Sequence, residues 1–396
     1  MTGDLSDGRA PALADAFVER FVLEPAADGE LRATRFAVKD LFDVAGYHTG
    51  CGNPTWRTTH PAATAHAAVV QMLLNAGARL VGKTRTDEMA YSIEGRNFHE
   101  GAPRNPASPE RLTGGSSSGA ASATAAGEVD FAVGTDTAGS VRVPAAWCGL
   151  FGLRPTHGRV SAAGLTPLAP SFDTVGWLAR SSAILRKVGG VLLGEGAMPA
   201  SRLSLVRDSS VNGCAEPSVA ARVESMIEAC AARGFRAGDV SLAVDLGAVA
   251  ECLRILQGHE AWSVHGRWIE SAQPTFGPGV AERFAAAHAI TADQVREAAR
   301  ERAAIIARLD AALPAGLMLC LPTVPAAAPR RDAARAELQA LRARIFPLTA
   351  LASLTGRPQI TLPLPATAGA PVGFSLLGWR NGDEALLETA QALAPP

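Results

Sequence analysis

The chain has 396 residues, of which 47% are hydrophobic, and its formal net charge is −1. This length permits a sizeable core, in one large body or in two or three domains of average size. Because the charges balance and no long basic or acidic run occurs, the composition argues against nucleic acid or an anionic membrane as the partner and favours a small molecule.

Targeting and redox signals are also weak. Residues 1–7 contain neither a basic region nor an apolar run of the kind that directs secretion. The longest uncharged apolar stretch, Ala311 to Pro329, contains four prolines and does not predict a membrane helix. The six cysteines show no Cys-x-x-Cys spacing. We therefore expect a cytoplasmic protein with reduced, mostly buried thiols and no metal site.

The N-terminal part of the chain predicts alternating helices and strands. Residues 11–23 form an amphipathic segment that opens with Pro11, a residue suited to the first turn of a helix. Apolar spacing and turn residues then predict a strand over 32–44, a helix over 63–75 that stops at Gly77, a strand over 79–81, a loop over 97–113, a helix over 120–126, a strand over 129–133 and a helix that begins near Ser140 or Pro144.

The C-terminal part begins with a largely helical region and returns to alternation. We expect helices over 219–233, 248–270, 291–312, 332–345 and 384–393, and strands over 359–364 and 372–377. The helical segment 215–310 is suited to shape a substrate pocket, although its Trp262, Trp268 and Phe276 are equally typical of a core. Since no linker or repeat interrupts the alternation, we predict one α/β body over residues 1–396.

The chain is poor in lysine. Only three of its 37 basic residues are lysines: Lys39, Lys83 and Lys187. Lys39 lies inside the apolar run Phe36–Phe42. A lysine can lose its proton when it is desolvated, whereas an arginine effectively cannot. Lys39 is therefore either a neutral catalytic amine or a lysine at a strand end whose charge reaches solvent.

Two short motifs match catalytic patterns in an unsuitable context. Residues 77–84 fit a phosphate-binding loop, but they follow a helix and favour a strand, so we interpret them as a helix cap followed by a strand. Residues 115–119 fit the Gly-x-Ser-x-Gly nucleophile elbow, with Ser117 as nucleophile, but a loop precedes them where the elbow requires a strand. That alternative also needs a histidine partner, to be sought among His157, His259, His265 and His288.

Two serine-containing turns carry a stronger signal. The turn Gly134–Ser140 follows the predicted strand 129–133 and consists of small and polar residues. Its slim backbone lets several N–H groups point at one position beside the Ser140 hydroxyl, which suits an oxyanion. A second turn, Gly114–Gly119, lies upstream. We predict that these two turns and Lys39 form one active site.

The chain resembles the amidase signature family. The resemblance covers most of the chain, is strongest from about residue 36 to 180, and rests on the segments Ala37–Asp43, Gly114–Gly119, Gly134–Ala145 and Cys148–Thr156, with weaker matches at Pro322–Pro325 and Pro371–Phe374. The blocks Asp87–Asn97 and Ser171–Trp177 are most similar to the branch that includes plant-type indole-3-acetamide hydrolases. The resemblance to the family implies a single α/β/α body with a central mixed sheet covered by helices.

The resemblance also implies a catalytic mechanism. Ser140 would attack the amide carbonyl, Ser116 would relay the proton, and a neutral Lys39 would be the general base. Ser116 would follow a cis peptide bond with Gly115. An acyl-enzyme would form and water would release the acid, without a metal or an organic cofactor. The oxyanion would be bound by the backbone N–H groups of Thr137, Ala138, Gly139 and Ser140.

Three neighbours of the nucleophile need separate interpretation. Ala138 stands where the family often has glycine, and it would be strained if the turn required a positive φ there. Asp136 and Arg142 are expected to be scaffold for the loop, because arginine is a poor proton acceptor and the aspartate can cap the N–H groups of the turn.

We therefore expect an amidase that acts on a small carboxamide, with an arylacetamide such as indole-3-acetamide as the suggested substrate. One alternative is the A-type subunit of a tRNA-dependent amidotransferase, which would need partner-binding surfaces and usually a longer chain. Another is a hydrolase with the Ser117 elbow. A third is a binding protein that kept the fold and lost the chemistry, which the joint presence of Lys39, Ser116 and Ser140 disfavours. A homo-oligomer is compatible with the sequence.

Overall fold

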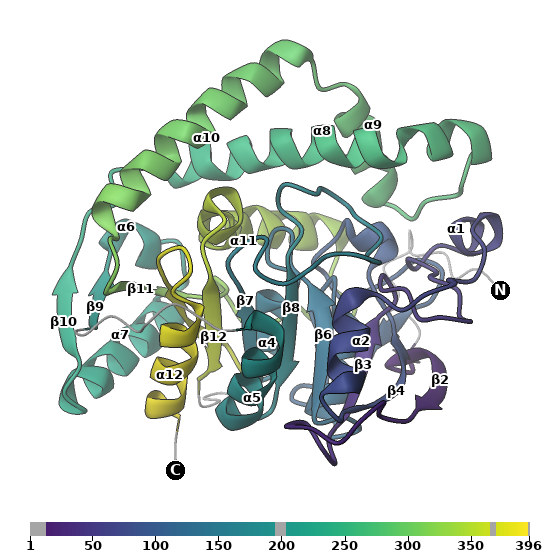
Figure 1. Ribbon diagram of the computed structural model, residues 1–396. Helices are drawn as coiled ribbons and strands as arrows, with labels where there is room; N and C mark the ends of the chain where they lie inside the picture. Colours follow the sequence, from purple (N-terminus) through teal and green to yellow (C-terminus); the bar gives the residue numbers. More distant parts are fainter. Residues whose placement is uncertain (1–12, 195–202, 365–369, 395–396) are drawn as a thin grey trace.

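The computed structural model describes residues 13–194, 203–364 and 370–394, and eleven of its strands form one sheet (Figure 1). In sheet order these strands are β10 (Arg236–Asp239), β9 (Ser204–Arg207), β11 (Leu317–Pro322), β13 (Gly373–Leu377), β12 (Gln359–Pro363), β7 (Phe151–Arg154), β8 (Val175–Ala179), β6 (Phe131–Thr135), β3 (Arg35–Lys39), β4 (Arg79–Thr84) and β2 (Phe17–Leu23). Two short strands, β1 (Leu13–Ala14) and β5 (Ala102–Pro103), form a separate parallel pair.

The sheet is mixed, and its parallel part positions the site. Strand β3 lies between β6 and β4 and runs parallel to both. The carboxyl ends of these strands therefore meet at one edge of the sheet. These ends are Lys39 on β3, Thr84 on β4 and Thr135 on β6. Segments that continue from the three strands are thereby brought together although they are far apart in the sequence.

Helices cover both faces of the sheet (Figure 1). The helices are α1 (Pro54–Thr59), α2 (Ala68–Asn75), α3 (Ser118–Ala125), α4 (Arg142–Trp147), α5 (Ser182–Leu193), α6 (Ser209–Asn212), α7 (Pro217–Ala232), α8 (Leu246–Ala272), α9 (Val280–His288), α10 (Ala292–Ala312), α11 (Arg335–Thr355) and α12 (Asp383–Leu393), with a short 3₁₀ helix, η2 (Glu88–Ala90). The predicted α/β class, with a central mixed sheet covered by helices, is confirmed.

Side-chain alternation along the strands explains how the faces are covered. Ala37 and Ala132 pack with the alanines of α3 and with α4. The larger side chains of the opposite face, such as Trp177, pack with α2, α5 and α12, and Trp177 Nε1 donates to Leu185 O on α5 at 2.9 Å. Because side chains two residues apart share a face, Lys39 belongs to the same face as Ala37.

Helix α8 packs against α9 and α10, and both α8 and α10 also pack on α11. Helices α8, α9 and α10 lie along the upper side of the molecule in Figure 1. In the described ranges, no helix is both long and apolar enough to cross a membrane.

The prediction of a helix at residues 11–23 is wrong over its described part. Phe17–Leu23 forms β2, which pairs antiparallel with β4 and covers its outer edge. Pro11 lies outside the described residues. Without β2, β4 would leave a row of N–H and C=O groups unpaired, so pairing outweighs the local amphipathic pattern.

The other predicted elements are present with shifted bounds. The helix predicted over 332–345 begins at Arg335 and continues to Thr355 through Pro347. Almost every residue from Ile345 onward in this helix is buried, so packing maintains it despite the backbone hydrogen bond that a proline removes. The structure contains β7, β8, β9, β10 and β11 and helices α1, α5, α6 and α9 in addition to those predicted.

Candidate active site

Lys39 is fully buried at the carboxyl end of β3. Its Nζ donates to Ser116 Oγ at 2.7 Å and to Thr135 Oγ1 at 2.7 Å. The two serine turns and the lysine strand are therefore in contact, as their positions at one sheet edge require. Thr135, the last residue of β6, was not predicted to touch the lysine.

Burial changes the acidity of this amine. Desolvation lowers the pKa of Lys39 to about 7, against the opposing charges of Asp87, Asp173 and Asp136. A substantial fraction of the amine is therefore neutral near pH 7. A neutral amine that donates to Ser116 Oγ can reverse this hydrogen bond and accept the hydroxyl proton.

The turn before α3 presents Ser116 through close packing of two glycines. The peptide bond between Gly115 and Ser116 is cis, as the resemblance implied. Gly114 has φ +72°, and a Cβ atom there would lie 2.6 Å from Trp147 Cε3. A Cβ atom on Gly115 would lie 2.3 Å from Asp87 Oδ2. Neither position accommodates a larger residue without rearrangement.

The Ser140 turn lies directly beside this segment. Ser117 N donates to Ser140 O at 3.2 Å, which joins the two turns. Ser140 is buried with 3% of its surface exposed. In the described part of the chain its hydroxyl has no hydrogen-bond partner, so the oxygen is available to a substrate or to Ser116.

The Asp136 carboxylate organises the turn that holds Ser140. Its Oδ1 accepts from Gly139 N at 2.8 Å, and its Oδ2 accepts from Val141 N at 3.1 Å and from Arg142 N at 3.2 Å. Arg142 adds two side-chain hydrogen bonds to the same carboxylate at 2.9 and 2.7 Å. Burial alone would raise the pKa of Asp136, but the charge and hydrogen bonds of Arg142, the charge of Arg154 and the backbone N–H of Val141 together outweigh it and lower that pKa far below its ordinary value. The predicted scaffold role of both residues is confirmed.

The backbone angles of the turn show whether Ala138 has the positive φ that would strain an alanine. Gly139 has φ +124°, whereas Ala138 is outside the positive-φ region and is unstrained. The N–H of Gly139 is already engaged by Asp136. Among the residues that the structure describes, the N–H groups of Thr137, Ala138 and Ser140 have no acceptor, so three of the four predicted oxyanion donors are free.

Two further carboxylates near the site escaped the sequence analysis. Thr137 Oγ1 donates to Asp173 Oδ1 at 2.6 Å, and Asp173 Oδ2 accepts from two backbone N–H groups, those of Leu168 and Ala169. Asp87 is fully buried against the cis peptide segment, and its own N–H donates to Ser116 O at 3.1 Å. Both acids lie in blocks that the sequence analysis had singled out, but only for resemblance.

The two short motifs have other roles. Residues 77–84 are the end of the α2 region and β4, as interpreted, and Lys83 is fully buried with an ion pair to Asp40 at 2.8 Å. Ser117 follows a loop, and its Oγ donates to Thr135 O at 3.3 Å. In the described contacts none of the four candidate histidines bonds to Ser117; His265, for example, bonds to Pro167 O at 2.8 Å.

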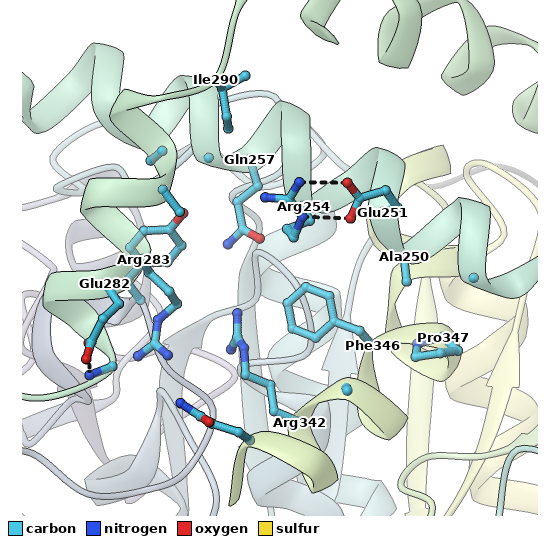
Figure 2. A pocket seen from close by; sticks show the side chains of 18 residues that line it. Ala250, Glu251, Arg254, Gln257, Glu282, Arg283, Ile290, Arg342, Phe346 and Pro347 are labelled. Carbon is cyan, nitrogen blue, oxygen red and sulfur yellow. Dashed lines mark hydrogen bonds and ion pairs between the residues drawn. The ribbon is translucent and has the colours of Figure 1, made fainter. Parts of the chain in front are cut away.

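A pocket of about 530 Å³ lies between α8, α9 and α11 (Figure 2). Residues 247–290 supply much of its wall, within the segment 215–310, and residues 339–347 and Tyr91 supply the rest. Lys39, Ser116 and Ser140 are outside this lining. Arg342, one of the lining residues, also borders a small cavity with Ile93 and Trp147. Ile93 O accepts from Gly115 N at 3.0 Å, and Trp147 packs on Gly114, so the pocket is one layer of side chains away from the Ser116 turn.

Comparison with known proteins gives a consistent result. The family model described as Amidase matches residues 26–197 and 201–387. Amidase 1 of Arabidopsis thaliana is 40% identical over 417 residues, which cover 96% of this chain and 97% of the relative. The chloroplastic outer envelope protein 64 of Arabidopsis thaliana is 33% identical, covering 96% and 70%. A solved structure described as a crystal structure of amidase superposes with a TM-score of 0.83 at 32% identity, covering 92% of this chain and 85% of that one.

Proposed function

The chain belongs to the amidase family and is an amide-hydrolysing enzyme, and from this premise we propose that it cleaves a small carboxamide through an acyl-enzyme on Ser140. The observation that carries the proposal is the contact of 2.7 Å between Lys39 Nζ and Ser116 Oγ, beside the turn that holds Ser140. A buried lysine whose pKa is lowered to about 7 is a suitable base for a serine hydroxyl.

In the first step the neutral Lys39 amine accepts the proton of Ser116, and Ser116 takes the proton of Ser140. Ser140 Oγ then forms a bond to the amide carbon, and the carbonyl oxygen becomes an oxyanion. The free N–H groups of Thr137, Ala138 and Ser140 would bind this oxyanion. Removal of one such donor typically lowers the rate by about a hundred- to a thousandfold.

In the second step the C–N bond breaks. The proton held on Lys39 returns through Ser116 to the leaving nitrogen, so that ammonia or an amine departs and the acyl group remains on Ser140. A water molecule, deprotonated by the same relay, attacks the ester. The acid leaves and the Ser140 hydroxyl is restored. Every proton that Lys39 accepts is returned, so the cycle is closed without another co-reactant.

The first acyl group to test is an arylacetyl group, with indole-3-acetamide as its representative. The reason is the resemblance of Asp87–Asn97 and Ser171–Trp177 to the indole-3-acetamide hydrolase branch. Copurification of a partner together with glutaminase activity would instead favour an amidotransferase subunit.

The deciding experiment compares Ser140→Ala with Ser117→Ala on a panel of aliphatic and arylacetic amides, with ammonia and acid measured separately. Ser140→Ala is expected to abolish hydrolysis and acyl-enzyme formation detected by mass spectrometry. Ser117→Ala, a matched change in the adjoining turn, is expected to retain most activity because Ser117 bonds only to a backbone carbonyl. The reverse result would establish the elbow and overturn the proposed triad.

A further inference from the structure

Two arginines face the same pocket from different helices. Arg283 extends from α9 and Arg342 from α11, and Figure 2 shows both guanidinium groups directed into the space between these helices. Arg342 Cζ lies 4.4 Å from the ring centroid of Phe346, and Arg283 Cζ lies 5.8 Å from that of Tyr91. Within the described part of the chain, neither guanidinium makes an ion pair.

The other charged groups of the pocket already have partners. Arg254 forms an ion pair with Glu251 at 2.6 Å on the same helix. Glu282 pairs with Arg335 and caps Gly279 N. Among the described charged residues of the pocket wall, Arg283 and Arg342 are thus the ones without an ion-pair partner, and the more distant charges of Glu94 and Asp87 oppose both.

The two neighbouring cations destabilise each other in this wall. Burial lowers the pKa of Arg342 to about 9, and the nearby charge of Arg283 lowers it further in the same direction. Burial also lowers the pKa of Arg283. Among the described residues, Arg283 Nε has no hydrogen-bond acceptor. Two desolvated cations with unused donors are stabilised by an anion that enters between them.

The rest of the wall suits an organic anion. Gln257 projects from α8 toward the same space in Figure 2, and its amide has no hydrogen-bond partner in the described structure. Phe346, Ile290 and the alanines of α8 and α9 supply apolar and aromatic surface. A carboxylate attached to a hydrocarbon or aryl group would satisfy both parts of this wall.

Helix α11 connects the arginine pocket to the nucleophile turn. Phe346 lines the pocket, and Thr349, one helical turn later, packs against Gly139. The seven residues from Arg342 to Thr349 span roughly 10 Å along the helix axis. A ligand with an amide at Ser140 and a carboxylate at the arginines would therefore need a spacer of several carbon atoms.

We propose that Arg283 and Arg342 bind a carboxylate on the acyl part of the substrate, so that the preferred substrates are monoamides of dicarboxylic acids. This inference rests on the proposed function and narrows its substrate class. The reaction is the same hydrolysis: the amide and water give a dicarboxylate and ammonium. The carboxylate takes no part in bond breaking, and the two arginines are binding residues.

The test uses the full-length protein and matched amides that differ only at the distal end. Suberamate is compared with octanamide, and 4-carboxyphenylacetamide with 4-methylphenylacetamide. The carboxylates are expected to have a kcat/KM about ten- to a hundredfold higher, which is the range for a charge-assisted contact. Equal or lower values for both carboxylates would overturn the inference and leave amide hydrolysis standing. Failure to cleave any of the four amides would instead count against the proposed function.

The variants Arg283→Gln and Arg342→Gln are expected to lower kcat/KM for the two carboxylates about ten- to a hundredfold more than for the matched neutral amides, and so to remove this preference. Arg254→Gln is the matched control, because that arginine is already paired with Glu251. A preference that survives both variants would refute the assignment.

Calorimetric titration with glutarate gives a readout that does not depend on turnover. The wild type, Ser140→Ala and Arg254→Gln proteins should bind glutarate, and the two other arginine variants should bind it at least tenfold more weakly. Thermal melting checks that each variant is folded. If one is not, the second variant and the matched amides still decide the question.

Discussion

The Lys39 amine is subject to two opposing effects. Burial favours its neutral form, whereas the carboxylate of Asp87, the strongest of the opposing charges, favours the protonated form. Asp87 is itself buried, and burial raises its pKa to about 6. At pH 7 the carboxylate is therefore mostly charged and holds the lysine pKa higher than burial alone would. This balance sets the pKa of Lys39 close to neutral pH.

The pH profile should report this balance. Because only the neutral amine accepts a proton, kcat/KM for a neutral amide should rise with pH through a midpoint near 7 and level off above it. Asp87→Asn removes the negative charge that favours the protonated form of Lys39. The asparagine keeps a side-chain oxygen that can accept from Gly95 N, as Asp87 Oδ2 does at 3.0 Å. The midpoint should then move down by about half to one pH unit. Asp332→Asn, on the surface, should leave it unchanged; an upward shift in Asp87→Asn would contradict the account.

Sequence reasoning reached Lys39 and not Asp87, for a physical reason. The burial of a lysine within an apolar run can be predicted from the sequence, because the apolar residues beside it on the strand share its environment. Asp87 lies in a block with Glu88, Ser92 and Glu94, where nothing local distinguishes a buried acid from an exposed one. Its burial comes from the glycine turn at 114–115 that packs on it after folding.

At the scale of elements, the nucleophile turn is fitted between β6 and α11. Gly139 has φ +124°, and a Cβ atom there would lie 2.9 Å from Thr349 Cγ2 and 3.2 Å from Val143 Cγ2. The turn thus needs glycine for its backbone conformation and for the approach of α11. The same contact holds the N–H groups of the turn in one direction.

Gly139→Ala is expected to destabilise the protein by about 1–3 kcal/mol, because it combines backbone strain with overpacking. It should also lower kcat more than KM, since the oxyanion donors are displaced. Gly158→Ala is a matched control: Gly158 has φ +84°, but nothing lies within 4 Å of the added Cβ atom. Urea unfolding and steady-state kinetics measure both effects. Equal losses of activity in the two variants would show that contact with α11 is irrelevant.

The element predictions failed where tertiary pairing decides. Residues 17–23 carry an amphipathic pattern, but they form a strand because they pair with the edge of β4. The predicted helix over 332–345 stops too early, because α11 continues through Pro347 to Thr355 with its second half buried on nearly all sides. The order of the strands was equally beyond reach, since β7 pairs with β12, more than 200 residues later.

At the scale of the molecule, one buried carboxylate joins the sheet body to the helical segment. Glu88 Oε1 accepts from Asn53 Nδ2 at 2.7 Å and is in hydrogen-bond contact with His99 Nε2 at 2.9 Å. Its Oε2 accepts from Gly277 N at 2.8 Å, in the loop between α8 and α9. The position of α9, and with it Arg283, thus depends on a residue beside β4.

Glu88→Gln should weaken the connection between the sheet body and the loop before α9. The new NH₂ group would face Asn53 Nδ2 or Gly277 N, which are donors and need an acceptor. An unsatisfied buried donor costs about 1–3 kcal/mol, so amide exchange in residues 273–280 should become roughly five- to a hundredfold faster. Glu297→Gln, on the exposed side of α10, is the control and should leave exchange in this loop unchanged. Unaltered exchange in Glu88→Gln would show that the loop is held by other contacts. Hydrogen exchange followed by mass spectrometry measures both variants.

The contacts of Arg142 bear on the order in which the site forms as the chain is synthesised and folds. Its guanidinium donates to Thr349 O at 2.9 Å, to Gln359 Oε1 at 2.6 Å and to Ser353 Oγ at 2.9 Å, across 207 or more residues of chain. A ribosome synthesises the nucleophile turn long before these acceptors exist. Contacts of such separation form late, because loop closure must precede them. If Ser140, Ser116 and Lys39 act as proposed, a growing chain would carry all three before the catalyst is complete, and activity would begin only after residues 349–359 have been added.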